Sequence, residues 1–127
     1  MTHEDFEKVI MEKLLDGEDE VFVMLKKQYS VATVISREFT GRGFFTAFNV
    51  PDNLAEISVN GRIDDVKACF DNSEVYYFIL YITAGKIDTL EGFSTLNEWE
   101  ENYSNAKVVH AYSDKREYDL NLPPHNL

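Results

Sequence analysis

The chain is poor in cysteine, with one in 127 residues, and it contains only three prolines. Because Cys69 has no second cysteine to pair with, an internal disulfide bond is excluded and a cytoplasmic location is expected. No apolar run approaches the length of about 20 residues that a membrane-spanning helix needs. The opening residues, Thr2-His3-Glu4-Asp5, are acidic and unlike a secretion signal. No internal repeat, linker or low-complexity segment is present.

Basic residues are also scarce: 12 stand against 23 acidic ones, and the formal net charge is -11. Binding of nucleic acid or of an anionic membrane needs concentrated lysine and arginine, so neither is expected as a partner. A basic protein partner fits the charge, because the electrostatic field would steer its association. Solubility in a bacterial-type cytoplasm is the simpler explanation of the same charge.

Sequence signatures of catalysis and of cofactor binding are incomplete. The pair Gly41-Arg42-Gly43 lacks the third glycine of a dinucleotide-binding loop, since Thr46 stands at that position. The stretch Gly92-Phe93-Ser94-Thr95-Leu96 lacks the second glycine of a nucleophile elbow. The histidines have no metal-ligand spacing and lie at His3, His110 and His125. We therefore predict no catalytic residue, no cofactor and no metal.

Two short helices are predicted before the sheet. Phe6, Ile10 and Leu14 recur at helical spacing, and this pattern places Glu7 on the outer side with the charged residues. Gly17 ends this helix, and a second one follows to about residue 28. Strands are predicted at 31–39, 44–50, 57–59, 62–70, 75–82, 87–93 and 107–112, with a short helix from Ser94 or Asn97 through Tyr103.

The predicted fold class is α+β, with an N-terminal helix pair packed on an antiparallel, meander-like sheet of five to six strands and a short late helix. Residues 1–127 form one domain, and about 114–127 are expected to be a poorly ordered tail. Residues 75–82 are apolar on both faces, which indicates a central strand covered on both sides. The helix pair would cover one face; a late helix, a curled sheet or the second subunit of a homodimer would cover the other.

Polar residues that interrupt apolar strands are the candidates for a pocket on the sheet. Glu38 and Glu91 lie within such strands, and an inward-facing glutamate needs a partner such as a nearby arginine. A glutamate–arginine pair that stabilises the sheet is the simpler interpretation; acid–base chemistry is the alternative. The candidate pocket residues are Arg37, Glu38, Glu91 and His110.

Acidic residues around the single tryptophan are the candidates for partner binding. Trp99 lies in Asn97-Glu98-Trp99-Glu100-Glu101, and its ring either packs over the sheet end or serves as an interface anchor ringed by carboxylates. A second acidic pair, Asp64 and Asp65, is either simply solvated or read by the same basic partner. The candidate partner-binding residues are Glu98, Trp99, Glu100, Glu101, Asp64 and Asp65.

Three segments together resemble a family of small, uncharacterised bacterial proteins: Leu25-x-x-Gln28, the hairpin Arg37-Glu38-Phe39-Thr40-Gly41-x-Gly43-Phe44-Phe45-Thr46, and Leu90-Glu91-Gly92-Phe93 with Trp99 following. The resemblance covers roughly 14–99 and implies a shared fold but no activity. In size and acidity the chain is also similar to cytoplasmic immunity proteins that neutralise toxin domains.

Two functions remain open from the sequence. The first is a non-catalytic, acidic protein-binding module of the immunity type, whose partner is a basic toxin domain. The second is a small-molecule-binding protein or enzyme with a polar pocket on the sheet. An oligomerisation domain is a third reading.

Overall fold

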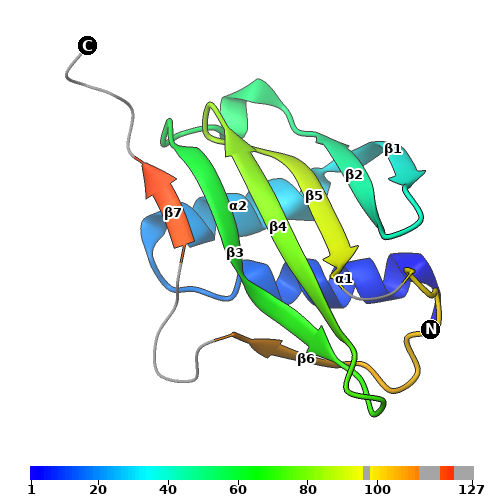
Figure 1. The fold of residues 1–127 in the computed structure, drawn as a ribbon. Coiled ribbons are helices and arrows are strands. Elements are labelled where there is room, and N and C mark those ends of the chain that lie inside the picture. Colours follow the sequence, from blue (N-terminus) through cyan, green and yellow to red (C-terminus); the bar gives the residue numbers. More distant parts are fainter. Residues whose placement is uncertain (96–97, 112–117, 122–127) are drawn as a thin grey trace.

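A computed structural model of the chain describes residues 1–95, 98–111 and 118–121. Two helices precede an antiparallel sheet, and one short 3-10 helix, η1, connects two of its strands (Figure 1). The elements are α1 (His3–Leu14), α2 (Glu20–Val31), β1 (Thr33–Phe39), β2 (Gly43–Asn49), η1 (Asp52–Leu54), β3 (Asn60–Cys69), β4 (Val75–Thr83), β5 (Lys86–Ser94), β6 (Lys107–His110) and β7 (Tyr118–Asn121).

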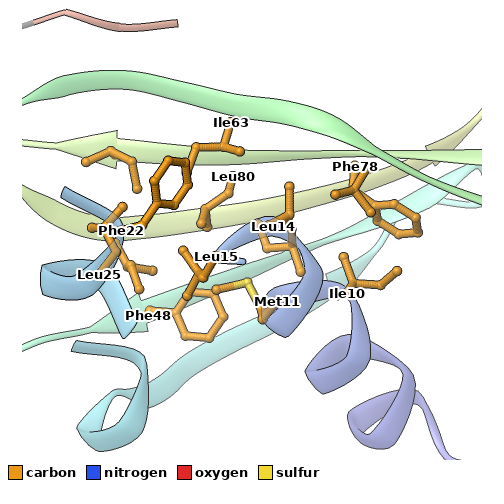
Figure 2. Close-up of a cluster of buried hydrophobic side chains, with 14 of the residues drawn as sticks. Ile10, Met11, Leu14, Leu15, Phe22, Leu25, Phe48, Ile63, Phe78 and Leu80 are labelled. Carbon is orange, nitrogen blue, oxygen red and sulfur yellow. The ribbon is translucent and has the colours of Figure 1, made fainter. Parts of the chain in front are cut away.

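Both helices lie on the same face of the sheet (Figure 1). The helix α1 begins with a capping box, in which the Thr2 hydroxyl accepts from the Asp5 amide and the Asp5 carboxylate accepts from the Thr2 amide. Apolar side chains of both helices meet those of the central strands in one core (Figure 2), and none of the described helices is long and apolar enough to cross a membrane.

The strand order is β1-β2-β5-β4-β3-β6, with β7 paired to the other half of the same edge of β3. The strands β3, β4 and β5 form a meander, whereas the hairpin β1–β2 precedes them in sequence and is added beside β5. This places β1 at one end of the sheet, where it pairs with β2 alone among the described strands.

The predicted α+β class, with two N-terminal helices on an antiparallel sheet, is confirmed. Three details differ. Residues 98–103 are irregular where a late helix was predicted, residues 57–59 are not a strand, and β7 lies within the predicted tail at 114–127. Strand β7 pairs there because β3 extends beyond its pairing with β6 and leaves its edge open at Asn60–Ile63.

The turn of the β1–β2 hairpin uses its two glycines in different ways. The Thr40 amide donates to the Gly43 carbonyl, and Gly41 adopts a φ of +89°, as the first central residue of a type II′ turn does. A Cβ on Gly43 would instead lie 1.8 Å from the carbonyl oxygen of Gly92 on β5. Of the two glycines only Gly41 has a positive φ, and Gly43 is required because two strands approach closely there.

A buried amide ties α2 to segments far away in sequence. The Nε2 atom of Gln28 donates to the carbonyls of Leu54 and Gly85, at 3.1 and 2.7 Å. Its Oε1 accepts from the Ile87 amide at 2.9 Å. The side chain is fully buried, and these contacts join α2 to η1 and to the β4–β5 turn.

We expect Gly43→Ala to destabilise the protein more than Gly41→Ala. At Gly41 a methyl group meets open space, so the cost is the left-handed backbone alone, roughly 1–2 kcal/mol. At Gly43 the new Cβ would force β2 and β5 apart, at a cost of about 3 kcal/mol or more. Urea unfolding of both variants measures the difference, and equal midpoints would contradict the close approach.

Candidate functional site

A buried polar network connects α1 to the β1–β2 hairpin. The carboxylate of Glu7 accepts two hydrogen bonds from Arg37, from Nε at 3.1 Å and from Nη2 at 2.9 Å. It also accepts from the Thr46 hydroxyl at 2.6 Å, and the Nε2 atom of His3 lies 3.2 Å away. Glu7 and Thr46 are almost completely buried. Arg37 and Thr46 are cross-strand partners in the hairpin, so the register of β1 against β2 brings both side chains to the same carboxylate.

The pKa of Glu7 shows that this network favours the charged form. Burial alone would raise the pKa, but hydrogen bonds with His3, Arg37 and Thr46 and the charge of Arg37 outweigh burial and lower the pKa to about 2. A carboxylate with so low a pKa does not exchange a proton near neutral pH, so Glu7 is unsuited to acid–base catalysis.

Aromatic rings extend the network to the segment after β5. The Nδ1 atom of His3 lies 2.8 Å from the Tyr103 hydroxyl, to which the Trp99 indole N–H donates at 3.1 Å. Burial raises the pKa of Tyr103 to about 12. The Trp99 ring stacks on Tyr76 with centroids 3.9 Å apart, and its backbone amide donates to the Gly41 carbonyl. These contacts support the packing interpretation of Trp99.

A cleft of about 710 Å³ opens beside this network, between the helices and β1. We call it the edge cleft. Of its thirteen lining residues, seven are charged and four are apolar. Its lining residues are Glu4, Glu7, Lys8, Glu12, Leu15, Asp16, Lys26, Tyr29, Ser30, Ala32, Val34, Arg37 and Phe48.

The charged groups around Tyr29 in the edge cleft give it negative surroundings on balance. Burial, together with the carboxylates of Glu7 and Glu12, raises the pKa of this phenol to about 12, and the two carboxylates outweigh the opposing effect of Arg37. Of the three cations that line the cleft, Arg37 is bound to Glu7, the Nζ atom of Lys26 donates to the Gly17 carbonyl at 2.7 Å, and Lys8 is exposed. The carboxylates of Glu4 and Glu12 belong to exposed residues at the rim.

The opposite face of the sheet carries no described helix or strand (Figure 1). The register places Glu38, Phe45, Glu91 and Ile79 in one row across β1, β2, β5 and β4. We call this the open face. The Tyr81 hydroxyl donates to Glu91 on it at 2.9 Å. Within the described residues the central strand is therefore covered by the helices on one side only. No described late helix covers the other side, and its covering by the second subunit of a homodimer stays a prediction.

The four predicted pocket residues are not brought together. Successive residues of a strand point to opposite faces, so Arg37 lies on the helix side and Glu38 on the open face. Glu91 shares the open face with Glu38, but Phe45 separates them. His110 is on β6, at the far edge of the sheet, where its Nε2 atom lies 3.0 Å from the Lys13 carbonyl. The pairing expected for the strand glutamates is made by Glu7 instead.

The predicted partner-binding acids do not form one surface with the edge cleft. Glu98, Glu100 and Glu101 are exposed in the segment after β5, and none of them lines the cleft. Asp64 lies 3.5 Å from the Nε atom of Arg62. Asp65 is only 1% exposed, so the prediction that it belongs to an acidic surface is wrong. The β-bulge between Ile63 and Val66 turns it inward.

Glu7 was predicted to be exposed but is buried, although its spacing from other residues of α1 indicates the buried face. His3, Glu7, Ile10 and Leu14 are spaced by four, three and four residues, which is the spacing of one helix face. The glutamate was assigned to the outer side because it is charged. Its partners Arg37 and Thr46 are 30 and 39 residues away, and nothing in the local sequence indicates that pairing.

Within the described residues, no group of three histidine, cysteine or acidic side chains could hold a metal ion. No family model, curated protein or solved structure matches the chain.

Acid should destabilise the protein through Glu7. Its pKa is about 2 when folded, against an ordinary value of 4.5, so the ionised form stabilises the fold above about pH 4.5 and this stabilisation is lost as the pH falls toward 2. We expect Glu7→Gln to lower the free energy of unfolding at pH 7 by about 2–3 kcal/mol and to flatten its dependence on pH between about 5 and 2.

The matched control is Glu12→Gln, on the same helix but exposed, which should change stability by less than about 0.5 kcal/mol. Denaturant unfolding at several pH values measures both variants. Parallel pH profiles for the wild type and Glu7→Gln would show that the Glu7 carboxylate is not the group responsible.

Proposed function

We propose that this chain is a non-catalytic protein-binding module that recognises a basic protein through the acidic side of its helix layer. In its specific form the proposal is an immunity-type protein that occludes a basic toxin domain. The observation that carries it is the concentration of acid along α1 and the turn after it: the first 20 residues hold eight acidic residues and two lysines.

The geometry of α1 supports a binding surface there. Glu4, Lys8, Glu12 and Asp16 follow one another at intervals of four residues, so they form a single stripe along the helix and its end. This stripe lines the edge cleft, whose floor includes the apolar side chains of Leu15 and Phe48. The lining holds four acidic and three basic side chains, and one of those cations, Arg37, is bound to the Glu7 carboxylate. An apolar floor with a charged rim suits a protein interface.

The state of the buried groups supports a non-catalytic role. Glu7 is held ionised by its hydrogen bonds, and Arg37 is engaged by that same carboxylate. The four polar residues expected to form a pocket on the sheet lie on two faces and three strands. Recognition of a positively charged surface uses the exposed carboxylates without requiring any of these groups to change its protonation.

We expect the double variant Glu4→Lys, Glu12→Lys to weaken binding to a basic partner by roughly tenfold, because it reverses two charges at the rim of the edge cleft. Calorimetric titration of purified basic toxin domains, including any encoded beside this gene, measures the affinity at about 50 mM and about 500 mM salt. Wild-type affinity should fall at the higher salt.

The control is Glu98→Lys, Glu101→Lys, which makes the same charge change in the segment after β5. It should bind within about twofold of wild type. A loss of affinity in this control alone would show that the partner binds the segment after β5 and not α1. Absence of binding to every basic domain at the lower salt would refute the proposed function itself.

A further inference from the structure

We propose that β1 accepts an extended segment of the basic partner, rich in lysine or arginine, as an additional strand beside the edge cleft. This inference rests on the proposed function, and it specifies the part of the partner that is bound. Addition of a strand to an exposed sheet edge is a recurring mode of peptide recognition, in which backbone hydrogen bonds provide affinity and side-chain contacts provide specificity.

The backbone of β1 is arranged for such pairing. The Thr40 amide bonds to the Gly43 carbonyl, and antiparallel pairs alternate between bonded and non-bonded. The pairs of Glu38 with Phe45 and of Ser36 with Ala47 are then the bonded ones. Arg37 and Phe39 accordingly direct their backbone N–H and C=O groups away from β2, toward the free edge.

This edge lacks most of the features by which proteins protect exposed strands. Natural edges are shielded by proline, lysine, bulges or a covering element. The strand β1 contains neither proline nor lysine, and all of its residues but Arg37 are exposed, including Ile35 at 66%. One bulge occurs between Val34 and Ser36, and it leaves Ser36–Phe39 in regular pairing with β2.

Side chains on both sides of β1 favour basic residues in the added strand. On the helix side, a long cationic side chain could lay its methylene groups along Val34 and Phe48 and place its charge near Glu12. On the open face, Glu38 has Phe45 as its cross-strand neighbour and no described strand on its other side. A lysine opposite Glu38 would form the favourable cross-strand charge pair.

A second copy of the chain is the competing occupant of this edge. Two copies would bring together two molecules that each carry a net charge of -11. A basic segment meets the same backbone groups without this repulsion. Charge complementarity therefore favours the partner segment over self-association.

The test uses a fluorescent nine-residue peptide that alternates lysine and valine, titrated into the full chain by anisotropy. We expect binding that raises protection of the Arg37 and Phe39 amides in hydrogen exchange. The same peptide with N-methyl groups on alternate backbone nitrogens keeps its charge but loses one hydrogen-bonding edge, and its affinity should fall at least tenfold. A peptide with glutamate in place of lysine should not bind.

Two variants of this chain locate the peptide. Glu38→Lys should weaken binding roughly tenfold. Glu91→Lys makes the same change on the same face, but Glu91 belongs to the interior strand β5, so its affinity should stay within about twofold of wild type. Equal losses in both variants would show that the peptide lies on the open face and would overturn the edge pairing.

The outcomes separate this inference from the proposed function. If basic toxin domains bind and respond to the α1 variants, but the N-methylated peptide binds as well as the unmodified one, only the strand pairing is wrong. Absence of binding by both the domains and the peptide refutes both. A dimer in sizing chromatography, with protected β1 amides and no peptide, would assign the edge to a second copy.

Discussion

The ion pair between Glu7 and Arg37 is the interaction on which the arrangement of the two layers depends. The Arg37 guanidinium donates two hydrogen bonds to the Glu7 carboxylate, and the Thr46 hydroxyl donates a third. A buried carboxylate without such partners would cost several kcal/mol. The hairpin β1–β2 is consequently held to α1 at one defined position. Among the described strands, its only pairing with the rest of the sheet is that of β2 with β5.

The same pair explains why the cleft and the free edge lie together. An arginine at the last strand of the sheet reaches inward to a helix, so β1 remains close to α1 without being covered by it. The ion pair holds β1 beside α1 at one point, and the space next to it is lined by residues from both elements.

The sequence predicts the parts of this fold whose signals are local. The helix at α1 follows from its cap and its apolar spacing, and the six strand segments that form β1 to β6 were recognised from composition and turns. Strand order and the burial of Glu7 depend on contacts between distant residues, which no local pattern records. The strand β7 was missed because its pairing depends on the free length of β3. For the site, Arg37 and Glu38 were both predicted to line one pocket, but the register places their side chains on opposite faces of the sheet.

The contacts of Gln28 have a consequence for the order of events in folding. Its three bonds span 26, 57 and 59 residues of chain, so none can form while only the helices are in place. An amide enclosed before those bonds exist would carry an uncompensated desolvation penalty. The second helix should therefore complete its docking only after the turn between β4 and β5 has formed.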